Sequence, residues 1–177
     1  MRHLFAFALI ALLLAPGFAH ADEPFLDPHL APLAPFLGKT YRGEMAESTP
    51  EKPVFDVTHY ERTLNGMAVR NLHSINDGDY CGESLVFWDP AAESLVYYYF
   101  TSAGFYTHGT MTVEEGKYVA HEMVTGGAGG ITEVRSSGEL HPDGSLHTRS
   151  EYLKDGQWVP GHAGVYREAP DAKVVMR

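Results

Sequence analysis

The chain has 177 residues, of which 44% are hydrophobic, and a formal net charge of −10 at pH 7. Asp and Glu number 23 against 13 Lys and Arg, and no basic cluster is present, which argues against binding to nucleic acid or to anionic lipid surfaces. Cys81 is the single cysteine, which excludes an internal disulfide.

Residues 1–21 have the pattern of a secretory signal peptide. Residues 1–3 form a short basic start, residues 4–14 are an unbroken apolar run, and residues 19–21 read Ala-His-Ala, a small-x-small cleavage site. The apolar run is too short to span a bilayer, and no later run is long enough for a membrane-spanning helix. No cysteine follows the cleavage site to carry a lipid anchor. We therefore predict an exported protein, periplasmic or secreted, with no membrane span.

The mature chain is predicted to consist of a lead-in, residues 22–38, and one domain over residues 39–177. The lead-in has a proline every few residues, which forbids a long helix, but its apolar side chains suit it to dock on the domain. We predict that it forms one short helical turn covering one end of the domain.

From residue 39 onward the sequence reads as short strands separated by turn signals. Asn65-Gly66 is the strongest hairpin signal of the chain, and Asp-Gly pairs follow at residues 143–144 and 155–156. We predict ten strands, over residues 40–47, 54–64, 67–75, 80–88, 94–101, 105–113, 117–125, 131–140, 145–153 and 157–168.

The short connections favour an antiparallel meander, in which each strand pairs with the next. A meander of ten strands would leave two long exposed edges unless it closed on itself. We therefore predict an all-β fold, an up-and-down β-barrel, with a two-sheet sandwich as the alternative. Eight-stranded barrels are just wide enough to fill with side chains, so a barrel of ten strands is predicted to enclose a cavity.

Two segments carry a resemblance to a known group of proteins. Leu33–Glu44, an apolar turn that leads into Gly38-Lys39-Thr40-Tyr41, resembles the opening of nitrobindin-like and related lipocalin-like bacterial proteins, with Tyr41 where those proteins usually carry tryptophan. Val165-Tyr166-Arg167 resembles their last strand, and the whole mature chain resembles a family of exported lipocalin-like proteins of uncharacterised function. The resemblance implies a calycin-type barrel whose relatives carry fatty acids, retinoids, haem or other apolar molecules.

The resemblance also bears on haem. In nitrobindins the axial histidine lies on the final strand, five residues before the equivalent of Tyr166. That position is Gly161 in this chain, and His162 follows it, so His162 is the haem ligand if haem binds. Because neighbouring side chains of a strand point to opposite faces, we predict no cofactor and keep haem binding as an alternative.

The densest aromatic block of the chain is Tyr97-Tyr98-Tyr99-Phe100. Tyr97 and Tyr99 share one face of the predicted strand and could line a ligand cavity, since alternate side chains of a strand lie on the same side. The alternative is an ordinary barrel wall with cross-strand aromatic pairs.

Glu133 and Arg135 likewise share one strand face. If this face points inward, the pair would lie at the ligand's polar end, where the arginine fork could hold a carboxylate, as in the fatty-acid-binding barrels that the chain distantly resembles. If it points outward, the pair belongs to a solvated face, which is the interpretation that the pattern favours.

Motifs for metals and nucleophiles are weak. Eight of the ten histidines follow residue 21, but none stands in an H-E-x-x-H motif or in a zinc pattern with cysteine, and G-x-S-x-G is absent. A three-histidine site across neighbouring strands stays open. The glycine-rich run of residues 126–130 lacks the Lys-Ser/Thr of a phosphate loop and is predicted to be a hairpin lip near the cavity mouth.

Three functions follow. The leading hypothesis is an exported binding protein that carries a small, largely hydrophobic ligand, with Tyr41, Tyr97, Tyr99, Glu133 and Arg135 near the cavity. The second is an isomerase-like or cyclase-like enzyme on the same scaffold, with His121, Glu122 or Glu133 as the acid or base, and an interior glutamate without a neighbouring cation would favour it. The third is a protein-interaction component with a filled interior. The sequence makes no prediction of the oligomeric state.

Overall fold

The computed structural model describes residues 24–114 and 116–177. The predicted signal peptide and its cleavage site lie outside the described residues. Over the described part of the chain, no helix is long and apolar enough to cross a membrane.

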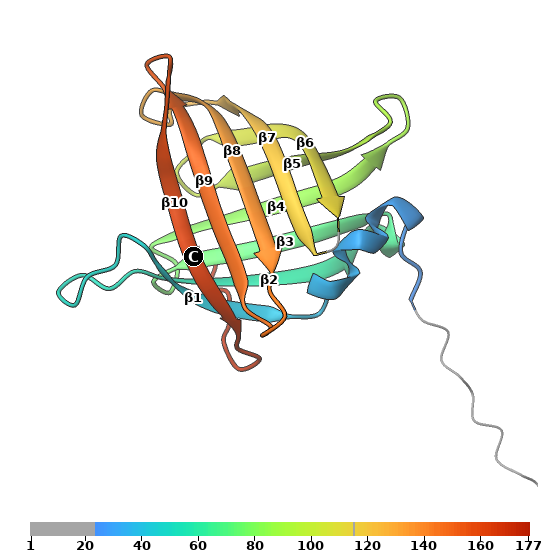
Figure 1. The fold of residues 1–177 in the computed structure, drawn as a ribbon, viewed down its shortest axis with the longest axis horizontal. Helices are drawn as coiled ribbons and strands as arrows, with labels where there is room; N and C mark the ends of the chain where they lie inside the picture. Colours follow the sequence, from blue (N-terminus) through green and yellow to red (C-terminus); the bar gives the residue numbers. More distant parts are fainter. Residues whose placement is uncertain (1–23, 115) are drawn as a thin grey trace, which may run out of the picture.

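The domain is a closed antiparallel barrel in which each strand pairs with the next and β1 pairs with β10 (Figure 1). The predicted all-β up-and-down barrel is therefore confirmed, and the two-sheet sandwich is excluded. The strands are β1 Thr40–Met45, β2 Phe55–Thr63, β3 Ala68–Ile75, β4 Tyr80–Asp89, β5 Ser94–Thr101, β6 Tyr106–Glu114, β7 Lys117–Thr125, β8 Ile131–Leu140, β9 Leu146–Lys154 and β10 Gln157–Glu168.

Alternating burial along the strands separates an inner face from an outer face. In β1, Tyr41, Gly43 and Met45 are buried, whereas Arg42 and Glu44 are exposed. This period of two is the pattern expected when one face of a sheet packs on the interior of a barrel.

Glycine on the inner face makes room for tyrosine rings. At the closing seam Gly43 of β1 pairs with Tyr166 of β10, and a Cβ atom at Gly43 would lie 2.7 Å from that ring. Gly138 of β8 stands in the same relation to Tyr118 of β7, whose ring would overlap a Cβ atom. The glycines therefore let each ring lie flat against the neighbouring strand, which keeps the rings out of the middle of the barrel.

The lead-in forms η1, a 3-10 helix over Pro28–Phe36. Asp27 caps it, because its carboxylate accepts a hydrogen bond from the backbone N–H of His29 at 2.9 Å. Leu30, Leu33 and Phe36 are almost completely buried against the core. The helix covers one end of the barrel, as predicted, and is the blue segment of Figure 1.

The β2–β3 hairpin forms where Asn65-Gly66 predicted it. Thr63 pairs with Ala68, and the tight turn between them contains η2, Leu64–Gly66, and Met67. Asn65 and Gly66 have φ values of 54° and 89°, the left-handed conformation that Asn and Gly tolerate best.

Candidate functional site

The barrel encloses a cavity of about 730 Å³. Leu33 of η1 lies against it at the covered end, where the ring of Phe36 packs on that of Tyr118 at the start of β7. Gly127 and Ala128, from the glycine-rich loop after the end of β7, line it at the opposite end. The volume is that of a pocket for a small organic molecule.

The cavity wall is mostly apolar and rich in tyrosine. Aliphatic side chains such as Val69, Val86 and Val134 contribute from several strands. Seven tyrosines line it: Tyr60, Tyr80, Tyr97, Tyr99, Tyr118, Tyr152 and Tyr166. A wall of this kind offers a bound molecule apolar contact area and a few phenol groups that can fix its orientation.

One polar chain runs along this wall from Asp56 to Tyr80. Asp56 Oδ1 lies 3.0 Å from His73 Nδ1, and His73 Nε2 lies 2.7 Å from the hydroxyl of Tyr99. The hydroxyls of Tyr99 and Tyr80 are 2.9 Å apart, and Tyr166 donates to Asp56 Oδ2 at 2.9 Å. Burial and then the charge of Asp56 raise the pKa of Tyr166 well above its usual range. Tyr166 therefore stays protonated and serves as a donor to the carboxylate.

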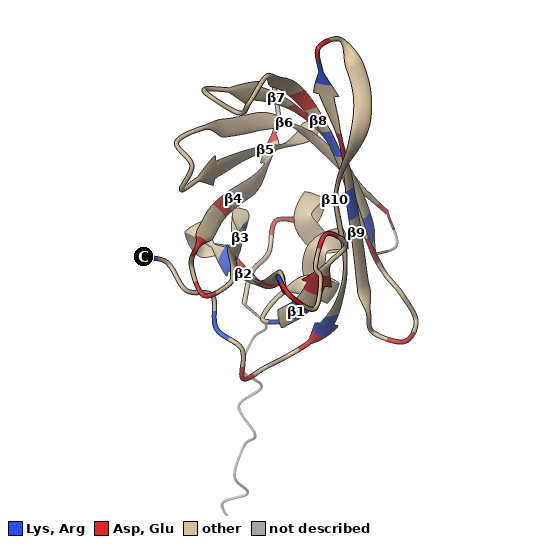
Figure 2. Cartoon of the chain, turned by 90° about the vertical axis from the view of Figure 1, so that its left-hand side faces the viewer, with Lys and Arg blue, Asp and Glu red and all other residues tan. Residues whose placement is uncertain are grey.

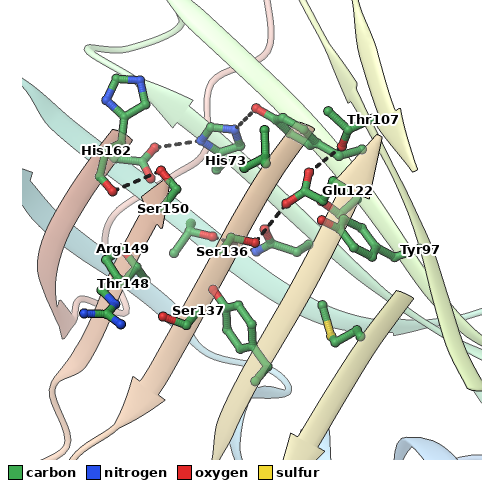
Figure 3. Close-up of a pocket in the computed structure, with 18 of the residues that line it drawn as sticks. His73, Tyr97, Thr107, Glu122, Ser136, Ser137, Thr148, Arg149, Ser150 and His162 are labelled. Carbon is green, nitrogen blue, oxygen red and sulfur yellow. Dashed lines mark hydrogen bonds and ion pairs between the residues drawn. The ribbon is translucent and has the colours of Figure 1, made fainter. Parts of the chain in front are cut away.

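A second polar group is centred on Glu122 of β7, which is only 6% exposed. Thr107 donates to Glu122 Oε2 at 2.5 Å, and Ser136 donates to Oε1 at 2.8 Å (Figure 3). No salt bridge to Glu122 occurs among the described residues. Glu122 is thus an interior glutamate whose charge is met by hydroxyl groups alone.

Tyr97 lies beside this glutamate (Figure 3). Its hydroxyl is buried, and it has no hydrogen-bond partner in the described part of the chain. Burial and then the charge of Glu122 raise the pKa of Tyr97 well above its usual range, so the phenol is neutral. A buried hydroxyl without a partner is costly, which makes Tyr97 a natural contact for a bound molecule.

Basic side chains are scarce around this cavity. Arg149 is the one Lys or Arg of the described residues that borders it, and it is exposed, on the face of β9 opposite to Thr148 and Ser150. Figure 3 shows its guanidinium turned away from Glu122. Asp and Glu positions also outnumber Lys and Arg over the whole barrel (Figure 2). The cavity wall therefore carries two buried carboxylates and His73, while the exposed side chains of Arg149 and His162 border it.

Three of the five residues predicted near the cavity lie inside the barrel. Tyr97 and Tyr99 line the cavity from β5. Tyr41 is completely buried in the core beside it, with its ring edge-on to that of Tyr60 at a centroid distance of 6.3 Å. Burial and then the charge of Glu168 raise the pKa of Tyr41.

Glu133 and Arg135 do not line the cavity, because Val134 and Ser136 occupy the inner face of β8. The Arg135 guanidinium stacks on the ring of Trp158, 3.9 Å from its centroid, and Glu133 pairs with His121 at 2.7 Å. Glu133 and Arg135 therefore lie on the outer face of β8. This corrects the expectation that the pair lies near the cavity, and Arg135 does not contact the cavity that the ligand would occupy.

Of the three acid or base candidates, Glu122 alone faces the interior. The sequence reasoning missed Asp56 and His73 altogether. The sequence did contain a signal for them. Asp56, Thr58 and Tyr60 are alternate residues of one predicted strand, so they share a face of it. Asn71 and His73 share a face of the next strand, and they pair with Tyr60 and Thr58 across the β2–β3 hairpin.

Two histidines, His73 and His162, border the cavity and bear on the haem alternative. His162, the predicted ligand, borders the cavity, but its side chain is exposed and its Nδ1 pairs with Glu47 at 2.7 Å. His73 has both ring nitrogens occupied, by Asp56 and by Tyr99. His73 therefore has no free ring nitrogen for an iron atom, whereas Nε2 of His162 has no partner among the described residues. No group of three potential metal ligands occurs within residues 24–114 and 116–177.

Comparison with known proteins bears on the fold. The sequence matches no protein family and no curated protein. Among solved structures, the crystal structure of Rv2717c from M. tuberculosis is similar, with a TM-score of 0.61 and 15% sequence identity over 82% of this chain and 99% of that chain. At this identity the likeness shows that the two chains share a barrel fold.

Proposed function

We propose that this protein is exported and that it binds a small, largely apolar molecule inside the barrel. The observation that carries the proposal is the cavity of about 730 Å³ with its apolar and aromatic wall. Burial of the ligand's apolar surface would supply most of the affinity, at about 25 cal/mol per Å². The interior is not filled by side chains, which disfavours the pure protein-interaction role. Export rests on the signal-like pattern of residues 1–21.

The test uses two valine variants and the neutral dye phenylnaphthylamine. Val134 lines the cavity, whereas Val119 lies on the outer face of β7 with 47% of its surface exposed. We expect Val134→Trp, which fills the cavity, to weaken dye binding by about tenfold or more. Val119→Trp should bind like the wild type. Equal affinity in all three proteins would mean that the dye binds elsewhere and would remove the basis of the proposal. Native mass spectrometry of the protein purified from its own host would give the mass of the natural ligand.

Two observations favour an acid–base enzyme as a second candidate: Glu122 is an interior glutamate without a neighbouring cation among the described residues, and a polar chain runs from Asp56 to Tyr80. Asp56 accepts the N–H of His73 Nδ1, which leaves the lone pair of Nε2 free to accept the hydroxyl proton of Tyr99. Burial raises the pKa of Tyr99 well above its usual range, so its proton would move to Nε2 only as its oxygen takes up another proton, and Asp56 would stabilise the imidazolium. The Tyr99 oxygen could take that other proton from Tyr80 or from a bound molecule, which is the chemistry of an isomerase.

This candidate predicts exchange of carbon-bound protons. An enzyme of this kind should incorporate deuterium from D₂O next to the carbonyl group of a bound apolar ketone, as measured by mass spectrometry. Tyr99→Phe is expected to lower the exchange rate by about 100-fold, while Tyr98→Phe, on the outer face of the same strand, leaves it unchanged. If the wild-type protein binds the dye but does not exchange carbon-bound protons of the ketone, the enzyme candidate is contradicted and ligand binding remains as the proposed function.

A further inference from the structure

We propose that the ligand is an amphipathic organic cation, with an ammonium group at Glu122 and Tyr97 and an apolar body along the rest of the cavity. This inference rests on the proposed function, because it names the chemistry of the molecule that the cavity binds.

Charge is the first argument. The carboxylates that face the cavity are Asp56 and Glu122. Apart from His73, the basic side chains that border it among the described residues are those of His162 and Arg149, and both are exposed. His73 and Tyr166 already bind the carboxylate of Asp56. A ligand carboxylate would add another anion to this interior without a cation to pair with it, which is costly away from water.

Hydrogen-bonding capacity is the second argument. A carboxylate accepts about four hydrogen bonds, and Glu122 receives two, from Thr107 and Ser136. The neighbouring Tyr97 is 4% exposed, and its buried hydroxyl has no partner in the part of the chain that the structure describes. Its oxygen can accept a hydrogen bond as well. One ammonium group can therefore donate to Glu122 and to Tyr97 at once and neutralise the buried charge.

The aromatic wall is the third argument. Tyr97, Tyr99 and Tyr118 line the same cavity, and the faces of such rings attract ammonium groups most strongly where water is excluded. A neutral alcohol could satisfy Tyr97 but would leave the charge of Glu122 unpaired. An ammonium group can both donate a hydrogen bond to Tyr97 and neutralise the charge of Glu122. The net charge of −10 would also attract a cation from solution.

The test ranks three ligands that share a decyl chain and differ in the head group. Decylammonium, decanol and decanoate compete with phenylnaphthylamine for the wild-type protein at pH 7, below their micelle concentrations. We expect decylammonium to bind about tenfold more tightly than decanol, and decanoate to bind most weakly. A ranking in which decanol or decanoate equals or exceeds decylammonium overturns the inference, while displacement of the dye by either of them still supports the proposed function. Failure of the dye to bind at all would refute both.

Matched variants then locate the head group. Glu122→Gln keeps the size of the side chain, and its amide can accept from one of the hydroxyls of Thr107 and Ser136 and donate to the other, so it should abolish the preference for decylammonium over decanol. Glu133→Gln, on the outer face of β8, should retain it. Tyr97→Phe should weaken decylammonium by about threefold to tenfold, since it removes one of two acceptors. Retained dye binding would show that each variant is folded. The ranking of the three ligands in the wild-type protein tests whether the ligand is a cation, without the use of any variant. A preference that survives Glu122→Gln overturns the assignment.

Discussion

Replacement of Phe36 by alanine is expected to lower the free energy of unfolding by about 3–5 kcal/mol, the usual cost of truncating a fully buried phenylalanine. Phe36 is 0% exposed, and its ring packs against those of Tyr60 and Tyr118 at centroid distances of 5.4 and 6.3 Å. A 3-10 helix as short as η1 has little stability of its own, so its position at the end of the barrel depends on this docking. Urea denaturation followed by circular dichroism measures the change.

Phe25 provides a control in the same segment, because 56% of its surface is exposed. Phe25→Ala is expected to change the free energy of unfolding by no more than about 0.5 kcal/mol, as for most surface substitutions. If Phe36→Ala were as mild as Phe25→Ala, η1 would not be docked on the barrel in solution, and the cavity would be open at both ends. The dye titration of the Phe36 variant would then reveal that opening as a change in affinity.

The strands could be predicted from the sequence because their signals are local. The predicted strand over residues 94–101 coincides with β5, and the strand over residues 117–125 coincides with β7. Asn65-Gly66 fixed the hairpin between β2 and β3, since few residues other than Asn and Gly accept its backbone conformation. Antiparallel closure then followed from the short connections and from the cost of exposed sheet edges.

The candidate site depends on contacts that are remote in sequence. Asp56 is buried because Tyr166, 110 residues away, donates to it across the seam where β1 pairs with β10. Glu122 is buried because Thr107 and Ser136 reach it from the two neighbouring strands. Burial of a carboxylate is favourable only once such donors are in place, so local polarity predicts the opposite face.

The strand of Glu133 and Arg135 shows the same limit of pattern analysis. Its two faces carry Glu133 and Arg135 on one side and Val134 and Ser136 on the other, so both contain polar side chains. A period of two predicts which residues share a face but selects the inner one only where one face is clearly apolar. Where the inner face of a strand also carries polar side chains, as Ser136 does here, that contrast is weak, and the contact of Ser136 with Glu122 accompanies the inward arrangement.

Alkaline conditions are expected to unfold the barrel cooperatively between about pH 10 and pH 12. Burial raises the pKa of Tyr118 to about 12, and it raises the pKa of Tyr60, Tyr97, Tyr99 and Tyr166 as well. The unfolded chain releases these phenol protons near pH 10, whereas the folded barrel retains them. The folded state therefore binds more protons in this interval, so stability falls as the pH rises through it and is unaffected below it.

The size of the effect follows from the same difference. Two pH units between the unfolded and folded pKa of Tyr118 correspond to about 3 kcal/mol from this one residue, a large share of the roughly 5–15 kcal/mol that stabilises a typical domain. Tyrosinate absorbance and far-ultraviolet circular dichroism, recorded along one pH titration, should change together. Tyr118→Phe removes one of the phenols and should make the fall in stability shallower over this interval. Gradual ionisation of all tyrosines with the circular dichroism unchanged would contradict the prediction, because it would mean that the phenols of the cavity wall ionise without leaving the fold.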